Sequence, residues 1–343
     1  MTLDLTIIVP AFNEVARLAE GMRRFDAAVS DGAVDIDRTE ILLVDDGSTD
    51  GTAATARGLL TRLPHHAVVS LPENRGKGAA VRTGVVLARG TYTAYMDADM
   101  AIDPRAIPLL VGALQANDLA VGSRALPDSM VESTHALRSI LGRLFNRLVT
   151  VGTGLHLPDT QCGFKAFRTP VARLLFHLVR IDGFAFDVEI LALAHRLGLR
   201  IAEVPVQWRH VSGSTVHPMH DSIPMLTDVY RSRLGLVPTP SVPSVRVSDE
   251  SAAVDAGANG GLAERVRTVV AATLEGVPVP VVAAKGSVIT MLPLVDQSDL
   301  QVVVSALQTE FKGLSVSSQS IDIKTLVALG SLSNRLEAPP SPA

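Results

Sequence analysis

The stretch TYTAYMDADM, residues 91–100, runs from an apolar segment into two aspartates separated by a single alanine. Its aromatic and β-branched residues predict a strand, and Asp97 and Asp99 fall where that strand would leave the core. Two neighbouring carboxylates repel each other, so a cation between them lowers their energy. Asp-x-Asp is common by chance, but its position after a buried strand favours a divalent metal site that a diphosphate completes. A role of Asp99 as the cap of the following helix is the alternative.

Four further apolar runs flank this stretch, and helical patterns separate them. Continuous apolar strands that alternate with helices are typical of a parallel sheet covered on both faces, which predicts the α/β class. Ligands of such sheets bind beyond the carboxyl ends of the strands, so the polar residues at those ends should converge in space. The predicted strands are LTIIVPAF (5–12), EILLVDD (40–46), HAVVSL (66–71), TYTAYMD (91–97) and LAVGSR (119–124), and the converging residues are Asp45, Asp46, Asp97, Asp99 and Arg124.

Composition narrows the class of protein. The chain has 343 residues, of which 47% are hydrophobic and 19% charged, as in a globular protein with a large core. A formal net charge of −4 argues against a nucleic-acid binder, because phosphate backbones require a basic excess. The single cysteine, Cys162, rules out an internal disulfide. Neither a signal peptide nor an apolar run long enough to span a membrane is evident, so we expect a protein that is soluble or bound at a membrane surface.

Positive charge is concentrated in residues 121–180, where eight Lys and Arg residues outnumber three acids. Such a segment suits an anionic partner, either phosphate groups or a lipid surface. Within it, residues 134–152 place six apolar side chains on one helical stripe, with Arg143 and Arg147 off that stripe. An ordinary core-facing helix explains this pattern, and so does a helix that lies on a membrane with its arginines at headgroup level.

The sequence also predicts the division of the chain. We expect a large α/β domain over residues 1–237, a Pro/Ser/Gly-rich linker over 238–261, a small α/β domain over 262–336 and a disordered tail over 337–343. The small domain carries no motif to which chemistry can be attached. A protein partner or a second copy of the chain is its expected contact.

Two loops at predicted strand ends suit an anionic ligand. In ENRGKGAAVRTG, residues 73–84, Arg75 and Lys77 precede a helix N-terminus, where positive charge is unfavourable unless an anion joins it. In VDDGSTDGT, residues 44–52, turn and cap chemistry explains most of the residues but not the two adjacent acids. One of these acids can accept hydrogen bonds from a base or a ribose.

The order of these motifs resembles that of the inverting nucleotide-sugar glycosyltransferases of the GT-A fold. The matching segments are PAFNE, VDDGSTDGT, NRGKGAAVRTG, MDADM, VGSR, DTQCGFKAF, FAFDVEIL, IAEVPVQW and GST, and they span roughly residues 3–233. DTQCGFKAF and FAFDVEIL are the specific ones. With them, the chain is most similar to the dolichyl-phosphate β-glucosyltransferases and their bacterial polyprenyl-phosphate relatives. The resemblance does not extend to residues 241–343.

The resemblance implies roles for individual residues. Asp97 and Asp99 would hold Mg²⁺ or Mn²⁺ against the diphosphate of the donor. Arg124 and Arg138 would contact phosphates, Arg138 that of the lipid acceptor, and Arg209 or the histidine after it would close over the site. The residues implied to contact the nucleotide sugar are Pro10, Phe12, Glu14, Val44 and Asp46 at the uridine end, together with Lys77, Ala98 and Arg209.

The implied reaction transfers glucose from UDP-glucose to a polyprenyl phosphate, with inversion to a β-linked product. Its acceptor is already an anion, so catalysis needs orientation and charge neutralisation rather than a strong general base. Related mannosyltransferases often carry Gln two residues after the Asp-x-Asp motif, whereas this chain has Ala101, which favours glucose. We expect the enzyme in the cytoplasm, peripheral to the inner face of the membrane.

Three alternatives stay open. The same fold can use another nucleotide sugar, such as a mannose donor. A hydroxyl acceptor would require a base, for which Asp187 is the best candidate, because Asp187 and Glu189 are acids in an apolar helical segment. A scaffold that binds nucleotide sugar without turnover and recruits partners through residues 262–335 is the third.

Overall fold

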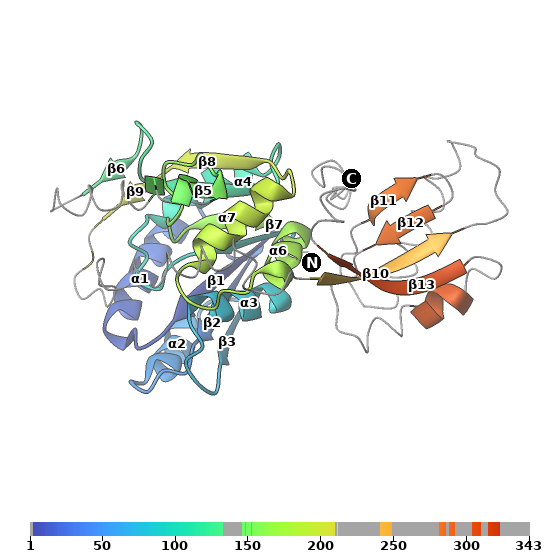
Figure 1. Ribbon diagram of the computed structural model, residues 1–343. Helices are drawn as coiled ribbons and strands as arrows, with labels where there is room; N and C mark the ends of the chain where they lie inside the picture. Colours follow the sequence, from blue (N-terminus) through green and yellow to red (C-terminus); the bar gives the residue numbers. More distant parts are fainter. Residues whose placement is uncertain are drawn as a thin grey trace. The chain divides into compact units, whose positions relative to one another are not determined.

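The computed structural model describes residues 3–132, 146–147, 149–151, 153–209, 211, 241–248, 281–285, 288–291, 304–309 and 315–322 (Figure 1). The chain divides into two compact units. The larger takes in Met1–His195 and Arg200–Val237, and the smaller takes in Arg196–Leu199 and Pro238–Ala343. The larger unit therefore contains all the segments on which the family resemblance rests.

A seven-stranded sheet forms the middle of the larger unit, in the order β3-β2-β1-β4-β7-β5-β8. Neighbouring strands are parallel except at β7, which is antiparallel to both β4 and β5. A separate two-stranded parallel sheet pairs β6 with β9. The strands are β1 (Leu5–Ala11), β2 (Thr39–Asp45), β3 (His66–Ser70), β4 (Tyr92–Tyr95), β5 (Leu119–Ser123), β6 (Met130–Val131), β7 (Lys165–Arg168), β8 (Ile201–Pro205) and β9 (Gln207–Trp208).

All five strands predicted from apolar runs are present as β1 to β5 and run in the same direction, which confirms the α/β class. The purely parallel order is wrong, because β7 lies between β4 and β5 and runs against both. β7 has only four residues, and its first and last residues, Lys165 and Arg168, are charged. Neither its length nor its composition distinguishes it from a loop.

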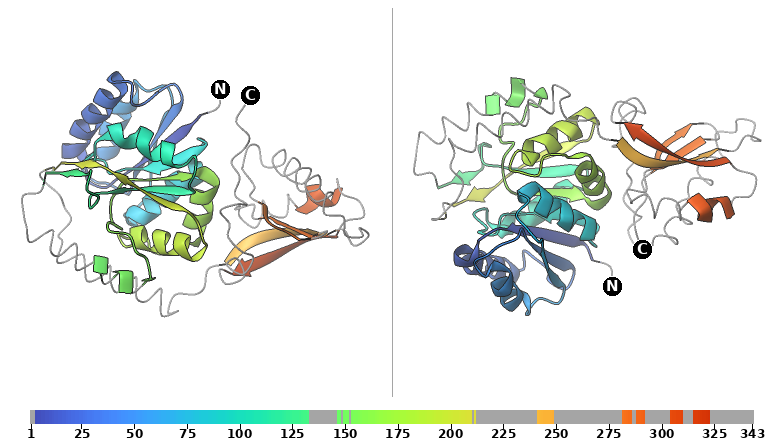
Figure 2. Two further views of the ribbon diagram at one scale, coloured as in Figure 1. Left: turned by 90° about the horizontal axis from the view of Figure 1, so that it is seen from above. Right: turned by 60° about the horizontal axis from the view of Figure 1, so that its bottom comes forward.

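One face of the sheet carries α1 (Val15–Ser30), α2 (Thr52–Leu60) and α4 (Ile107–Ala113), as Figures 1 and 2 show. Leu18, Met22 and Phe25 of α1 follow helical spacing and pack with Ile7 and Val9 of β1. Successive strand side chains alternate between faces, so this apolar stripe of α1 meets only every second residue of β1. This packing fixes α1, whose first turn follows the PAFNE loop.

The opposite face carries α3 (Lys77–Leu87), α6 (Thr169–Leu178) and α7 (Phe186–Arg196). An aromatic cluster joins the sheet to α6 and α7, with ring centroids 5.6 to 6.3 Å apart. The packing of α3 on this face places its first residue, Lys77, at the carboxyl edge of the sheet. The cluster consists of Tyr95, Phe167, Phe176 and Phe186.

The smaller unit contains an antiparallel sheet in the order β11-β12-β10-β13. Its first strand, β10, lies inside the segment predicted as a linker over 238–261, so that prediction is wrong for Ser241–Ser248. The proline in SVPSVRVS favours a linker, but among the described residues Pro243 pairs with β13 alone, because pairing with β12 begins at Val245. A residue without an N–H is tolerated where a strand is paired on one side. The other strands are β11 (Val281–Lys285), β12 (Val288–Met291) and β13 (Ser315–Asp322).

Several predictions lie outside the described residues. They include Arg138, Arg143, His210, most of the predicted helix over 134–152 and the predicted tail over 337–343. Of the helices in the described part of the chain, none combines the length and the hydropathy that crossing a bilayer requires.

Candidate active site

The motif residues lie where the parallel strands end at their carboxyl edge. β2 ends at Asp45, and Asp46 comes directly after it. Asp97 and Asp99 come after β4, and Arg124 comes after β5. Because β2, β4 and β5 run in the same direction, these residues share one edge of the sheet. The residues that the strand pattern predicts to converge therefore lie at the same edge of the sheet.

Two cationic side chains from other elements contact the Asp97–Asp99 pair. Lys77, the first residue of α3, places Nζ 2.5 Å from Oδ1 of Asp97. Arg17 of α1 places a guanidinium nitrogen 3.2 Å from Oδ2 of Asp99. The other oxygen of Asp99 accepts the backbone N–H of Ala101 at 3.1 Å. Each carboxylate is thus neutralised by a cation from a different helix.

Asp99 is not the cap of the helix that follows. That role belongs to Asp103, whose side chain accepts the backbone N–H of Arg105 at 2.9 Å, at the start of the short 3₁₀ helix η1 (Pro104–Ala106). Asp99 closes a turn onto Ala101 and turns its second oxygen to Arg17. The capping alternative is therefore wrong.

Glu14 extends this group of charges along α1. Arg17 donates to Oε1 of Glu14 as well as to Asp99, so one guanidinium bridges two acids. The second oxygen, Oε2 of Glu14, is buried and has no hydrogen-bond partner among the described residues. Burial raises the pKa of Glu14 to about 7; the charge of Arg17 opposes this shift, and the charges of Asp99 and Asp97 add to it. Glu14 therefore titrates near neutral pH.

The two ion pairs differ in their electrostatics. Burial by itself lowers the pKa of Lys77, but the charges of Asp97, Asp187 and Asp99 outweigh burial and hold this pKa above its usual range. Burial and the charge of Asp97 raise the pKa of Asp99, against the opposing effects of the Ala101 N–H, Arg17 and Lys77. Lys77 is consequently a permanent cation, while Asp99 lies in a place where more positive charge is favourable.

Close backbone approaches fix the Asp-Ala-Asp turn. A Cβ on Gly163, in DTQCGFKAF, would lie 2.0 Å from Oδ2 of Asp97. A Cβ on Gly21 of α1 would lie 2.1 Å from the carbonyl oxygen of Ala98, whose own side chain is buried. Glycine at these two positions lets a loop and a helix pack directly against the two sides of the turn.

Asp46 positions the loop that carries Lys77. Its two oxygens accept the backbone N–H groups of Arg75 at 2.9 Å and Gly76 at 2.7 Å. Burial raises the pKa of Asp46, and these two hydrogen bonds oppose that shift. Gly76 has φ 104°, and a Cβ there would meet the carbonyl oxygen of Asp182 at 2.5 Å. The contacts of Asp46 are thus structural, and its predicted contact with uridine stays a prediction.

The other residues implied to bind uridine lie on β1 and β2 or just after β1. Pro10 and Val44 are register partners with buried side chains, whereas Phe12 is 42% exposed. The loop after β1 is tied to the one after β2, since the backbone N–H of Asn13 donates to Ser48 Oγ at 2.9 Å. This hydrogen bond fixes the loop that carries the exposed ring of Phe12 at the carboxyl edge of the sheet.

Arg124 is held by an acid that the sequence did not single out. Its Nε and one terminal nitrogen lie 2.7 and 2.9 Å from the two oxygens of Asp159, and its backbone N–H also donates to Asp159 at 3.0 Å. Burial opposes ionisation of Asp159, but Arg124 outweighs it and keeps the pKa of Asp159 below its usual range. This two-pronged pairing orients Arg124 at the end of β5.

Asp187 and Glu189 are bonded inside the fold. Asp187 accepts from the hydroxyl of Tyr95 at 2.5 Å and from Nζ of Lys165, which is itself fully buried. Glu189 accepts the backbone N–H groups of Arg180 at 3.0 Å and Ile181 at 2.9 Å. Both acids satisfy buried donors, which explains their presence in an apolar helix.

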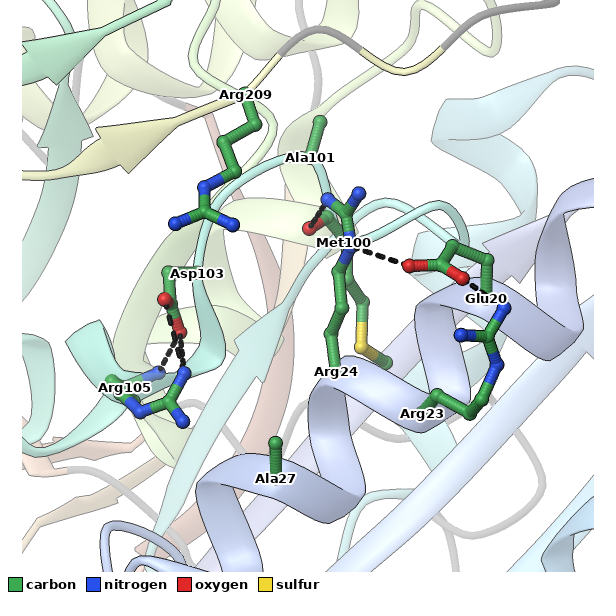
Figure 3. Close-up of a pocket in the computed structure, with 9 residues that line it drawn as sticks. All are labelled: Glu20, Arg23, Arg24, Ala27, Met100, Ala101, Asp103, Arg105 and Arg209. Atoms are coloured by element: carbon green, nitrogen blue, oxygen red, sulfur yellow. Dashed lines mark hydrogen bonds and ion pairs between the residues drawn. The ribbon is translucent and has the colours of Figure 1, made fainter.

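A pocket of about 280 Å³ opens beside the Asp-Ala-Asp turn, on the side of α1 and η1 (Figure 3). Arg209 lines it, and its backbone N–H donates to the carbonyl of Ala101 at 2.8 Å. Arg24 donates from its guanidinium to the carbonyl of Met100 at 3.2 Å. The predicted closure of Arg209 over a ligand stays a prediction. The remaining lining residues are Glu20, Arg23, Ala27, Asp103 and Arg105.

Sequence reasoning missed three residues of this site: Arg17, Asp159 and Gly163. Arg17 follows Glu14 at helical i, i+3 spacing, which indicates their ion pair, but the partner Asp99 is 82 residues away. Asp159 and Gly163 belong to the segment most specific for the family, yet only the fold brings them to Arg124 and Asp97.

Comparison with known proteins gives consistent results. A family model described as Glycosyl transferase family 2 matches residues 6–176. Over 243 residues the chain is 38% identical to a dolichyl-phosphate β-glucosyltransferase of Dictyostelium discoideum, covering 67% of this chain and 73% of that protein. It is 35% identical to the dolichyl-phosphate β-glucosyltransferase of Drosophila melanogaster, covering 67% of this chain and 74% of that protein.

A solved structure shares the fold at lower sequence similarity. Glucosyl-3-phosphoglycerate synthase of Mycobacterium tuberculosis, in complex with Mn²⁺, UDP-glucose and phosphoglyceric acid, matches with a TM-score of 0.52 and 22% identity. The match covers 68% of this chain and 80% of that one. It confirms the GT-A type of α/β fold.

Proposed function

The chain belongs to glycosyl transferase family 2, and we propose that it transfers glucose from UDP-glucose to a polyprenyl phosphate, giving polyprenyl-phosphate β-glucose. The observation that carries the proposal is the Asp97–Asp99 pair at the carboxyl edge of the sheet, with Lys77 and Arg17 beside it. This arrangement suits a diphosphate donor that brings a metal ion. The names of the relatives from Dictyostelium and Drosophila support glucose as the sugar and a lipid phosphate as the acceptor.

The donor set fits a hard divalent cation. Asp97 and Asp99 offer carboxylate oxygens, and the described residues contain no group of three or more His, Cys, Asp and Glu placed to enclose a metal. Mg²⁺ and Mn²⁺ commonly bind one or two carboxylates and complete their shell with phosphate oxygens and water. Bound there, the ion would neutralise negative charge on the departing diphosphate. Mn²⁺ in the related synthase structure supports this assignment.

The proposed reaction is a displacement at the anomeric carbon. An oxygen of the acceptor phosphate forms the new bond, the bond to the diphosphate breaks, and UDP leaves with the electron pair. Lys77 is suited to hold the donor diphosphate, because it is a permanent cation at the first residue of α3. Arg124, fixed by Asp159, is proposed to contact a phosphate, and Arg138 is proposed to contact that of the lipid acceptor.

A phosphate acceptor agrees better with the surroundings of Asp187 than a hydroxyl acceptor does. A hydroxyl needs a base, and the candidate base is 4% exposed and bonded to Lys165 and Tyr95. A phosphate is ionised at neutral pH and needs none. The lipid acceptor also supports a location at the inner face of the membrane, where the protein would bind peripherally.

The proposal is tested by a donor and acceptor screen. The purified full chain is incubated with radiolabelled UDP-glucose, UDP-galactose or GDP-mannose and with polyprenyl phosphate or a neutral polyprenol, with and without EDTA. We expect transfer only from UDP-glucose to the phosphate, and none with EDTA. Asp99→Ala should abolish transfer, while Asp4→Ala, at an exposed pair with Arg38, should keep it.

Each alternative has its own outcome in this screen. Transfer to the alcohol would indicate a hydroxyl acceptor, and transfer from GDP-mannose would indicate a different donor. Metal-dependent binding of UDP-glucose without any product would indicate a scaffold. Chelator-resistant transfer would overturn the metal role of Asp97 and Asp99.

A further inference from the structure

The arrangement of Arg17, Lys77 and Glu14 points to a step that precedes transfer. We propose that Arg17 and Lys77 are exchangeable counter-ions, which a divalent cation displaces from Asp99 and Asp97. Arg17 then moves onto Oε2 of Glu14, and Lys77 moves onto the donor diphosphate. The inference rests on the proposed function, because it assumes that this site takes a metal and a diphosphate together.

The first support is competition for the same oxygens. Lys77 engages Oδ1 of Asp97 at 2.5 Å, and Arg17 engages Oδ2 of Asp99 at 3.2 Å. The other two oxygens are less open to a metal ion, because Oδ2 of Asp97 lies against Gly163 and Oδ1 of Asp99 accepts the backbone N–H of Ala101. A divalent ion at Oδ1 of Asp97 and Oδ2 of Asp99 would repel both cations, so the metal and the two ion pairs compete.

The second support is the charge balance. The carboxylates of Asp97 and Asp99 and the cations of Arg17 and Lys77 sum to zero, and Glu14 adds one negative charge when it is ionised, so a metal ion arriving alone makes the site positive. A doubly anionic diphosphate that arrives with the metal ion removes this positive excess. Metal and nucleotide should therefore bind cooperatively, each raising the affinity of the other by the same factor.

The third support is the vacant acceptor on Glu14. Arg17 now donates one terminal nitrogen to Oε1 of Glu14 and the other to Asp99. Oε2 of Glu14 is buried and has no partner among the described residues, which is costly for a polar atom. When Arg17 leaves Asp99, its freed nitrogen can turn to Oε2 and complete a two-pronged pair with Glu14. The unpaired oxygen is explained as the second position of Arg17.

The partners of Lys77 allow the corresponding move. Its backbone belongs to the first turn of α3, held by Gly76 and the loop bonded to Asp46, so only the side chain needs to turn. The loop places the ammonium group beside a helix N-terminus, where a diphosphate is attracted by both. Lys77 thus moves from one anion to another within the same site.

The test is a titration of the full chain with Mn²⁺, in which free ion is measured by electron paramagnetic resonance, with and without UDP. Wild type should bind Mn²⁺ weakly alone and at least tenfold more tightly with UDP. Arg17→Met should strengthen binding of Mn²⁺ alone by about fivefold, since a repelling charge is removed. Lys77→Met should do the same, but should lose most of the gain that UDP provides.

Two further variants sharpen the result. Glu14→Gln should weaken binding of Mn²⁺, the opposite sign to Arg17→Met, because Arg17 then lacks its second carboxylate oxygen. Arg38→Met is the matched control: Arg38 directly precedes β2, at the end of that strand away from Asp45, and pairs with Asp4 on the surface, so its loss should leave Mn²⁺ binding unchanged. Circular dichroism of each variant checks that it is folded.

The inference is overturned if Arg17→Met and Lys77→Met, both folded, bind Mn²⁺ alone as weakly as wild type or more weakly. Both cations would then orient the aspartates rather than compete with the metal. That result leaves the proposed function standing as long as wild type transfers glucose in a metal-dependent way. Absence of Mn²⁺ binding by wild type, even with UDP, would instead contradict the proposed function.

Discussion

At the scale of single residues, the site is a set of charges that cancel in pairs. Asp97 is paired with Lys77, Asp99 with Arg17, and Arg124 with Asp159. Each pair joins residues from different elements, so each charge is held by the fold rather than by its neighbours in sequence. Substitutions at these positions act on chemistry and stability together, and the controls must separate the two.

Gly163→Ala is predicted to impair transfer through Asp97. The added Cβ would lie 2.0 Å from Oδ2 of Asp97, so the carboxylate or the loop must shift. We expect kcat/KM for UDP-glucose to fall by about tenfold or more, because small displacements of reacting groups are costly. Gly58→Ala, on the exposed side of α2 with no atom within 4 Å of the new Cβ, should keep full activity. Equal activity of the two variants would contradict the close packing at Asp97.

Glu14 is predicted to make stability depend on pH. The pKa of Glu14 is about 7 in the folded protein against 4.5 in the unfolded chain. The contribution of Glu14 to the free energy of unfolding is therefore fully present below pH 4.5 and is lost as pH rises through 7. In EDTA, the free energy of unfolding of wild type should fall by on the order of 2 kcal/mol relative to that of Glu14→Gln between pH 4.5 and 8. Urea unfolding of both proteins across this range measures the difference. A difference that stays constant with pH would show that Glu14 does not titrate there.

At the scale of elements, the antiparallel strand β7 joins the sheet to the buried network behind the site. It brings Lys165 between β4 and β5, where Nζ reaches Asp187 of α7 and the carbonyl of Cys162 at 2.8 Å. Tyr95, at the end of β4, donates to the same carboxylate. The strand that leads into the Asp-Ala-Asp turn is thus tied to α7 by the hydrogen bond of Tyr95, and β7 is tied to α7 by a buried ion pair.

Lys165→Met is predicted to destabilise the larger unit by about 3–5 kcal/mol, because the charge of Asp187 is left buried without its cation. Adding Asp187→Asn should restore part of this loss. Urea unfolding of the full chain measures both effects. Arg38→Met, which breaks an exposed pair with Asp4, should cost less than about 1 kcal/mol. A small effect of Lys165→Met would mean that water or another group neutralises Asp187.

The elements that the sequence predicted are those that depend on local pattern. The apolar runs that became β1 to β5 are continuous, and the acids at their ends mark the carboxyl edge. β7 could not be predicted, because its pairing joins Lys165–Arg168 to strands more than forty residues earlier, with no pattern of its own. Similarly, the ion pair of Arg17 with Asp99 and the two-pronged pair of Arg124 with Asp159 join parts of the chain that are distant in sequence.

At the scale of the whole molecule, every described residue assigned to the donor site lies between Pro10 and Arg209, within the span of the family resemblance. The smaller unit contributes a four-stranded antiparallel sheet, and its proposed role is contact with a protein partner or a second copy of the chain. The strand that contains Pro243, β10, was not predicted, because its composition is typical of linkers.

Removal of residues 238–343 is predicted to leave binding of UDP unchanged, because the truncated chain keeps all the residues assigned to the donor site. Isothermal titration of the full and truncated chains with UDP and Mn²⁺ makes the comparison, and size-exclusion chromatography with light scattering reports any change of oligomeric state. Loss of UDP binding by a folded truncated protein would show that the smaller unit completes the site.

The central claim is that the aspartates at the end of β4 hold a metal ion against the donor diphosphate. A crystal of the full chain soaked with Mn²⁺ and UDP-glucose, with data collected at the manganese absorption edge, tests it most directly. The account predicts an anomalous peak bonded to Asp97, Asp99 and the diphosphate, with Lys77 turned toward the phosphates. A nucleotide sugar bound elsewhere, with Lys77 still on Asp97, would contradict it.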